Sequence, residues 1–231
     1  MTAGARGFAF ALWQMLWHSP NGRRLGGLLG LVVIVGGVIG LLYAAGLLGS
    51  QGGGTTDTGV KIENARLIET QPPPGVSEFT VGPTVGRFAP NFEASHMDSG
   101  ARVKLSDFRG RPVYLNWFAS WCVPCRAEIP DIDKLQKRHP DLIVIGINRE
   151  EPLSRARSFL ESIGLDDGAR GFQYRVPLMD PDGTLYRAYR GLGMPVSIFL
   201  NAEGRVVRVY NGQLTLEQME TFYAEASQRT S

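Results

Sequence analysis

Cysteine and histidine are scarce in this chain of 231 residues, which has two cysteines and three histidines. Two cysteines are too few for a disulfide scaffold, so the folded part must be held together by burial of apolar side chains. One-sided charge is also lacking, because the net charge is +2 and no block of like charges occurs. This balance gives little reason to expect nucleic acid as a partner.

Charged side chains are missing altogether between Leu25 and Leu48. As an α-helix this stretch would be about 36 Å long, enough to cross a hydrocarbon core of about 30 Å. A cleaved signal peptide is the alternative, since Ala44-Ala45-Gly46 offers small residues to a peptidase. The apolar region of a signal peptide is usually only about 7–15 residues long, however, so the pattern favours an uncleaved transmembrane anchor over residues 25–48.

The charges that flank this span predict its orientation. Arg6, Arg23 and Arg24 precede the span, and no acidic residue occurs before Asp57. Because positive residues stay on the cytoplasmic side, residues 1–24 are predicted to form a cytoplasmic segment. We therefore expect a single-pass protein of the cell membrane whose catalytic domain lies outside the cytoplasm.

The chain after the span divides into a linker and a folded domain. Residues 49–86 are rich in glycine, threonine and proline, and they predict a flexible linker or stalk with a short strand near 61–68. The folded domain is predicted over 87–231. Its strand candidates and helix candidates alternate, which predicts an α/β fold with a mixed central sheet and helices on both faces. The clearest of these elements are strands at 112–118, 141–148, 195–200 and 205–210, and helices at 122–139, 154–163 and 216–226.

Cys122 and Cys125 stand between the strand at 112–118 and the helix that follows it. A strand that passes through Cys-x-x-Cys into a helix is typical of thioredoxin-like redox proteins. The helix start favours a thiolate on Cys122, and Cys125 lies about one turn later, within reach to resolve a mixed disulfide. Pro124 between them costs no helical hydrogen bond, because it falls in the first turn.

A structural disulfide or half of a zinc site is the alternative for this pair. Zinc would need two further ligands at suitable spacing. The other candidates after the membrane span are His96 and His139, and neither has a partner ligand beside it in the sequence. We therefore expect no metal and no cofactor.

Several motifs together give the domain a family resemblance. They are Phe88–Phe92 (FAPNF), Leu105–Gly110 (LSDFRG), Leu115–Pro130 (LNWFASWCVPCRAEIP), Asp180–Gly183 (DPDG) and Gly193–Phe199 (GMPVSIF). From about Arg87 to Ala226 the chain resembles the TlpA/ResA group of extracytoplasmic thioredoxin-like proteins. The resemblance implies a thioredoxin-like fold and a membrane-tethered thiol–disulfide oxidoreductase with a redox-active Cys122–Cys125 pair, acting in most relatives as a reductant.

The resemblance also implies roles for residues around the pair. Pro195 aligns with a cis-proline whose loop packs against the cysteines and holds an incoming substrate strand. Met194 would contact the disulfide region through its backbone, and its side chain would shape the fit of the substrate. Trp121, beside Cys122, is implied to cover the sulfurs, although an ordinary surface aromatic is the alternative.

Asn116 and Glu128 separate this chain from thioredoxin proper. Thioredoxins carry a buried aspartate at the Asn116 position, which helps to move protons for the resolving cysteine. Glu128, three residues after Cys125, matches a glutamate of the TlpA/ResA group that takes over part of this work. From spacing alone, a solvated helix carboxylate is the favoured interpretation of Glu128, and the resemblance reverses that preference.

The predicted function is reduction of disulfides in extracytoplasmic proteins, with apocytochrome c during cytochrome c maturation as the best-known type of client. A membrane thiol carrier is expected as the electron donor. The alternatives are an oxidase that introduces disulfides and a copper-handling or redox-sensing binding protein. Val196-Ser197, in place of the usual threonines, and the long loop 166–174 are where recognition of the partner is expected to be tuned.

Overall fold

The structure, a computed structural model, describes residues 59–76 and 79–228. The predicted cytoplasmic segment at 1–24 and the predicted anchor at 25–48 lie outside these residues. Among the helices of the described part, none has the length and apolar character needed to span a bilayer. The described residues all fall in one compact unit, Thr55–Ser231.

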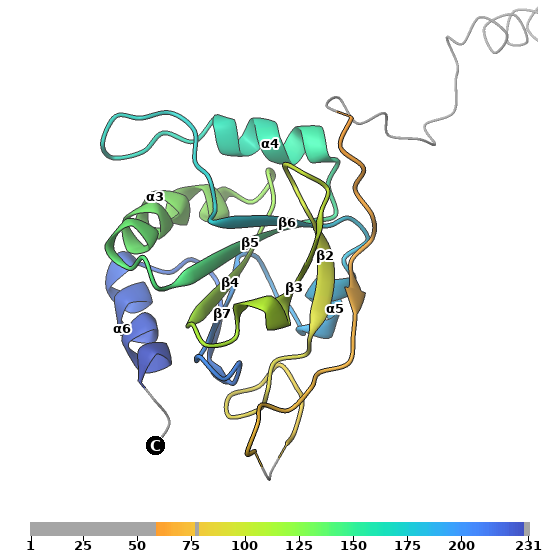
Figure 1. The fold of residues 1–231 in the computed structure, drawn as a ribbon. Coiled ribbons are helices and arrows are strands. Elements are labelled where there is room, and N and C mark those ends of the chain that lie inside the picture. Colours follow the sequence, from red (N-terminus) through yellow and green to blue (C-terminus); the bar gives the residue numbers. More distant parts are fainter. Residues whose placement is uncertain (1–58, 77–78, 229–231) are drawn as a thin grey trace, which may run out of the picture. The chain divides into compact units, whose positions relative to one another are not determined.

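A mixed β-sheet runs through the centre of this unit (Figure 1). Its order is β1-β2-β6-β5-β4-β7-β8, with β3 paired to β2. The neighbours β4, β5 and β6 are parallel, whereas β2, β7 and β8 run antiparallel to the strands they pair with. The strands are β1 (Arg66–Leu67), β2 (Phe92–His96), β3 (Arg102–Lys104), β4 (Val113–Phe118), β5 (Ile143–Arg149), β6 (Val176–Asp180), β7 (Val196–Leu200) and β8 (Val206–Asn211).

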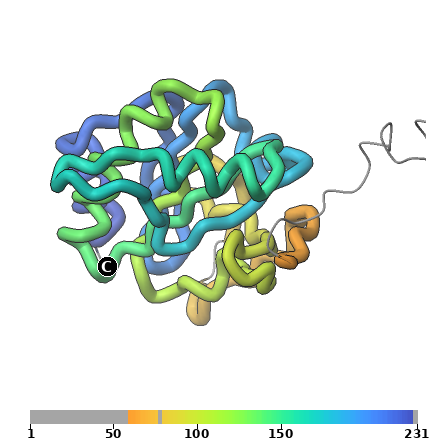
Figure 2. Tube along the Cα trace, turned by 90° about the horizontal axis from the view of Figure 1, so that it is seen from above, coloured from red at the N-terminus to blue at the C-terminus, as the bar shows by residue number. Residues whose placement is uncertain are grey.

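Helices cover both faces of the sheet, as predicted. On one face, α3, α4 and α6 bury their apolar sides in one side-chain cluster, and on the other face η1 and α5 pack in a second cluster. Seen from above, α4 (teal) crosses in front of the sheet (Figure 2). The helical elements are η1 (Leu105–Phe108), α3 (Val123–Arg138), α4 (Leu153–Glu161), α5 (Thr184–Ala188) and α6 (Leu216–Ser227).

The central strand β4 is buried along its whole length. Its side chains alternate between the two faces, because successive residues of a strand point to opposite sides. Tyr114 and Phe118 enter the cluster under α3, and Leu115 and Trp117 enter the other. The polar Asn116 therefore shares the face of Tyr114 and Phe118, inside the layer that α3 covers.

Residues before the predicted domain start at Arg87 already pack on the sheet. Strand β1 pairs with β2, which confirms the short strand expected near 61–68. Ala65 is buried in the second cluster, and the Thr70 hydroxyl accepts a hydrogen bond from the Asn91 backbone N–H at 2.8 Å. The physical reason is that β2 offers unpaired backbone groups along its edge, which an extended segment can satisfy. This stretch therefore belongs to the packed structure rather than to a free stalk.

Candidate active site

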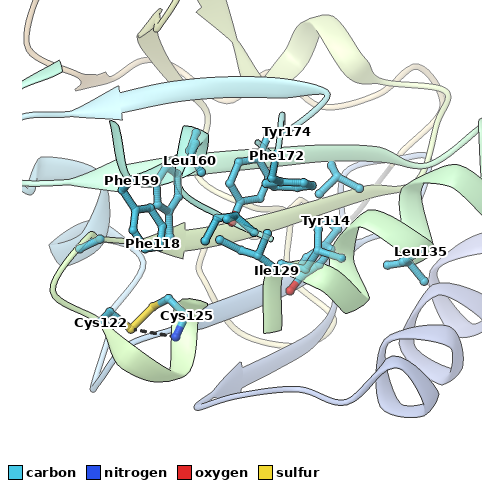
Figure 3. Close-up of a cluster of buried hydrophobic side chains, with 14 of the residues drawn as sticks. Tyr114, Phe118, Cys122, Cys125, Ile129, Leu135, Phe159, Leu160, Phe172 and Tyr174 are labelled. Carbon is cyan, nitrogen blue, oxygen red and sulfur yellow. Dashed lines mark hydrogen bonds between the residues drawn. A yellow bond between two sulfur atoms is a disulfide. The ribbon is translucent and has the colours of Figure 1, made fainter. Parts of the chain in front are cut away.

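The two cysteines form a disulfide at the start of α3, directly after β4 (Figure 3). Their Cα atoms are 5.3 Å apart. Cys122 is the N-cap of the helix, and its Sγ accepts a hydrogen bond from the Cys125 backbone N–H at 3.2 Å. Cys122 is 4% exposed and Cys125 is fully buried. Of the two cysteine residues, only Cys122 keeps any exposed surface.

Two exposed apolar side chains flank Cys122 in the sequence: Trp121 is 57% exposed and Val123 77%. Leu192, in the loop before β7, is 86% exposed. The half-buried Pro124 lies within the first turn of α3, as expected from the sequence.

The loop before β7 lies close to the same region of the fold. The Met194–Pro195 peptide bond is cis, as the resemblance implied. Pro195 is buried, and its carbonyl oxygen accepts a hydrogen bond from the Gly212 N–H at 2.8 Å. Met194 is partly buried and packs against both apolar clusters, one of which contains the two cysteines.

Glu128 is fully buried one helical turn after Cys125, so it is not a solvated helix carboxylate. Its Oε1 accepts a hydrogen bond from the Asn116 side-chain amide at 2.8 Å, and its Oε2 accepts one from the Leu214 backbone N–H at 3.1 Å. The structure thus joins the two residues, Asn116 and Glu128, that distinguish this chain from thioredoxin proper.

Burial raises the pKa of Glu128 to about 7. The hydrogen bonds from Leu214 and Asn116 oppose this rise, and the charge of Asp131 on the same helix adds to it. A carboxyl group of this kind changes its protonation state near neutral pH, which is the property that a proton carrier needs.

Three hydroxyl groups complete this polar cluster. Tyr114 and Tyr174 were not predicted from the sequence as site residues, and Ser197 was predicted only to tune partner recognition. Tyr174 donates to Asn116 Oδ1 at 2.6 Å, the Asn116 amide donates to the Tyr114 oxygen at 3.2 Å, and the hydroxyls of Tyr114 and Ser197 are 2.9 Å apart. Burial, and after it the charge of Glu128, raises the pKa of both tyrosines well above the usual value. Tyr114 could have been predicted as a site residue, because it lies two residues before Asn116 and therefore on the same face of the strand. No pattern in the sequence indicates Tyr174.

The position of Ser197 corrects one expectation. Ser197 and its neighbour Val196 are both buried in β7. The alternation along β7 directs Ser197 toward Tyr114, its hydrogen-bond partner in the interior. Val196 instead belongs to the apolar cluster on the other face of the sheet, so only Ser197 is part of the polar site.

The loop 166–174 is also placed differently from the expectation. Lys134 pairs with Asp166, and Lys137 pairs with Asp167 at 2.9 Å, so the loop lies beside the C-terminal part of α3. The cysteines are at the opposite end of that helix, roughly 15 Å away at 1.5 Å per residue. This loop supplies the buried Tyr174 to the polar cluster around Asn116.

A second buried carboxylate, Glu151, supports the turn before the cysteines. Its oxygens accept hydrogen bonds from the Ser120 N–H at 2.8 Å, the Ser120 hydroxyl at 2.5 Å and the Asn148 side-chain amide at 2.9 Å. The sequence analysis missed this residue. The available signal was that β4 and β5 are parallel neighbours, so the residues that follow their carboxyl ends meet at one edge of the sheet.

Both sulfurs of the pair are used in the disulfide. Within residues 59–76 and 79–228, no three side chains of the types His, Cys, Asp or Glu gather as metal ligands would.

A Cys-x-x-Cys disulfide at the start of the helix that follows an inner strand of a mixed sheet is the arrangement of thiol–disulfide oxidoreductases of thioredoxin-like fold. Comparison with known proteins gives the family. The Redoxin family model matches residues 84–224, and the chain belongs to this family.

Individual relatives narrow the class further. The chain is 26% identical over 141 residues to the thiol-disulfide oxidoreductase ResA of Bacillus thuringiensis, covering 60% of this chain and 76% of the relative. It is 30% identical over 148 residues to the thioredoxin-like protein YneN of Bacillus subtilis, covering 62% and 81%. A crystal structure from Chlorobium tepidum, designated a thiol:disulfide interchange protein DsbE, matches with a TM-score of 0.54 at 29% identity, covering 62% and 97%. The chain is thus a TlpA/ResA-like thiol–disulfide oxidoreductase.

Proposed function

We propose that this chain is a membrane-anchored reductant that delivers electrons to disulfides of extracytoplasmic proteins. The proposal is supported mainly by the Cys122–Cys125 disulfide at the start of α3, in which Cys122 is the helix N-cap and Cys125 is fully buried. In the dithiol form, the Cys122 thiolate attacks one sulfur of a client disulfide, and the other client sulfur leaves as a thiolate and takes up a proton. Cys125, as a thiolate, then attacks Cys122, which releases the second client thiol and leaves the Cys122–Cys125 disulfide. Two electrons have passed to the client.

The direction of electron flow is proposed from the family resemblance, because most proteins of the TlpA/ResA group act as reductants. A strongly oxidising pair such as that of DsbA owes its high potential to stabilisation of its reduced, thiolate form. In this chain Val123 and Pro124, between the cysteines, carry no charge that would add to the stabilisation at the helix start.

Glu128 is the proposed proton acceptor for Cys125. Before Cys125 can attack, its thiol must lose a proton inside a buried site. Glu128 lies one turn away on the same helix, and its pKa of about 7 allows it to take up that proton at neutral pH. Asn116 positions the carboxylate through its amide.

The client is proposed to bind as an extended, apolar segment next to the disulfide. Trp121, Val123 and Leu192 supply exposed apolar contacts, and the backbone beside Pro195 supplies the edge on which such a segment lies. Haem-site cysteines of apocytochrome c, during cytochrome c maturation, are the proposed client type. A membrane thiol carrier is the proposed electron donor, since a reductant outside the cytoplasm needs a supply of electrons.

The proposed location rests on the sequence. The uncharged stretch 25–48 would anchor the chain, with residues 1–24 in the cytoplasm and the redox domain outside. Protease treatment of intact spheroplasts tests this arrangement. We expect the domain to be digested while the chain sediments with the membranes, and full protection of the domain would contradict it.

The direction of electron flow is tested by measuring the reduction potential of the 231-residue chain. The chain would be purified in detergent and equilibrated with glutathione buffers. We expect a value nearer to that of thioredoxin, about −270 mV, than to that of DsbA, about −120 mV. A value nearer to that of DsbA would overturn the reductant assignment in favour of an oxidase. Cys125→Ser, which cannot form the disulfide, provides the control for signals from other groups.

A further inference from the structure

The Asn116 side-chain amide has two possible orientations, and they have opposite effects on Glu128. In the observed orientation Nδ2 donates to Glu128 Oε1 at 2.8 Å. Rotation by half a turn would present Oδ1 to the carboxyl group instead, and that oxygen can accept a hydrogen bond only from a protonated carboxylic acid. The orientation therefore decides whether the site favours the charged or the neutral form of Glu128.

We propose that Tyr174 is a positioning residue of the exchange reaction, whose hydroxyl holds the Asn116 amide in the orientation that donates to Glu128. The proposal rests on the proposed role of Glu128 as the proton acceptor for Cys125. Tyr174 touches neither sulfur in any hydrogen bond of the described residues, and it would act through Asn116 alone.

The hydroxyl of Tyr174 can hold the amide because its proton has one acceptor. Tyr174 is buried, and in the described part of the chain its hydroxyl has one hydrogen-bond partner, Asn116 Oδ1 at 2.6 Å. If the amide rotated, Nδ2 would face this hydroxyl and the Tyr174 O–H would be left without an acceptor in the interior. A buried donor without a partner is costly, so the rotated state is disfavoured.

Tyr114 differs from Tyr174 in this respect and supplies the matched control. Its hydroxyl lies 2.9 Å from Ser197 Oγ and 3.2 Å from Asn116 Nδ2. With the Ser197 hydroxyl beside it, Tyr114 can either donate or accept, and so it is compatible with both orientations of the amide. Both tyrosines are buried, and a change to phenylalanine removes one hydroxyl from each while the ring remains.

The ring of Tyr174 is fixed independently of its hydroxyl. It stacks on Phe118 with 5.0 Å between the ring centroids and meets Phe172 edge-on at 4.7 Å. It also lies over Gly146, where a Cβ atom would come within 2.2 Å of the ring. Tyr174→Phe should therefore keep the packing and lose only the hydrogen bond.

Other polar groups face Glu128 from each element packed against it, and they stay in place in both variants. They are Asp131 from α3, Asn116 from β4 and the Leu214 N–H from the segment before α6, with Ser197 of β7 reached through Asn116 and Tyr114. None of these groups is altered by the substitution at residue 174. A change in the pH profile of Tyr174→Phe therefore reflects a change in the orientation of the Asn116 side-chain amide.

The test is the pH profile of the rate at which the reduced 231-residue chain reduces oxidised glutathione. Without the Tyr174 hydroxyl, Asn116 can turn its oxygen toward a protonated Glu128, which favours the neutral form. We expect Tyr174→Phe to move the midpoint of the profile upward by about one pH unit, and Tyr114→Phe to move it much less. Equal shifts for the two variants, or no shift for Tyr174→Phe, would overturn the proposal.

Two further arms separate this proposal from the one on which it rests. If Glu128→Gln leaves the profile of the parent unchanged, the role of Glu128 itself fails. If Glu128→Gln changes the pH profile, the double variant Glu128→Gln/Tyr174→Phe should have the same midpoint as Glu128→Gln alone. A different midpoint would show that Tyr174 does not act through Glu128.

Proton NMR of the unmodified chain keeps the proposal testable even if Tyr174→Phe does not fold. The Asn116 side-chain amide protons should show cross-relaxation with the Glu128 side chain. Cross-relaxation with the Tyr174 ring instead would place the amide in the rotated orientation and overturn the proposal.

Discussion

Glu128 and Glu151 are both buried carboxyl groups beside the same disulfide, yet they are held in different ways. Glu151 accepts three hydrogen bonds, two of them from Ser120 in the turn that leads to Cys122. Glu128 accepts two, and one of them comes from a side-chain amide whose orientation depends on a tyrosine. Its environment raises the pKa of Glu128 to about 7.

The two carboxyl groups thus differ in the number of hydrogen-bond donors that face them and in what those donors belong to. The donors of Glu151 come from Ser120 and Asn148, so Glu151 supports the turn before the cysteines. Fewer donors, together with complete burial, leave Glu128 poised between its charged and neutral forms. Changes at Glu128 and at Glu151 should therefore have different effects, on the pH dependence of stability, on stability itself and on the rate of exchange.

The largest expected effect is a pH-dependent loss of stability that belongs to Glu128. Its pKa in the folded chain, about 7, lies above the ordinary value of 4.5, so the folded state holds a proton that the unfolded state has released between these values. The contribution of the neutral carboxyl is fully present below pH 4.5 and is lost as the pH rises through about 7. Relative to Glu128→Gln, the parent should lose about 3 kcal/mol of unfolding free energy across this window.

Denaturant unfolding of the two oxidised proteins at pH 4.5 and pH 8 measures this difference. Other titrating groups cancel in the comparison, because they are common to both proteins. A constant difference between the two pH values would mean that Glu128 does not titrate in this range.

The next effect concerns the stability role of Glu151. Glu151→Ala leaves the Ser120 N–H, the Ser120 hydroxyl and the Asn148 amide without their acceptor. We expect a loss of about 2 kcal/mol of unfolding free energy. The pH midpoint of thiol exchange should stay where it is in the parent, and a moved midpoint would show that Glu151 shares the proton chemistry.

Glu128→Gln should slow exchange rather than unfold the chain. Glutamine keeps one oxygen for the Asn116 amide but cannot take up the proton of Cys125. We expect the rate of disulfide reduction at pH 7 to fall at least about tenfold, and the titration curves of the two thiols to shift. Thiol titration curves identical to those of the parent would remove Glu128 from the mechanism.

The smallest effect is expected at Ser197. Ser197→Ala takes away the hydroxyl partner of Tyr114 in the interior, and the loss of one buried hydrogen bond should cost about 1 kcal/mol of unfolding free energy. Because Ser197 is buried, the relative rates for different protein disulfides should not change. A changed preference among substrates would restore the role in partner recognition that the sequence suggested.

Local patterns were enough to predict the elements that carry the cysteines. The apolar run at β4, the Cys-x-x-Cys pair and the helix after it are contiguous, so the sequence could place Cys122, Cys125 and Glu128 together. The family resemblance added the cis peptide bond at Pro195, which composition and spacing do not predict.

The residues that the sequence could not predict reach the site through contacts between distant parts of the chain. Tyr174 comes from a loop 58 residues after Asn116, and Glu151 lies 31 residues after Ser120. No periodicity links such positions, since their contact depends on the order of strands in the sheet. The residues before Arg87 were misplaced for a related reason: their partner is the edge of β2, and their own composition resembles that of a linker.

Carbon-13 NMR of the side-chain carboxyl groups, recorded on the oxidised chain labelled at glutamate, tests the central claim most directly, because it follows the protonation of Glu128 itself. We predict a transition with a midpoint at about pH 7 that is absent in Glu128→Gln. The claim would be contradicted if no glutamate carboxyl group titrated near pH 7, or if the transition near pH 7 persisted in Glu128→Gln.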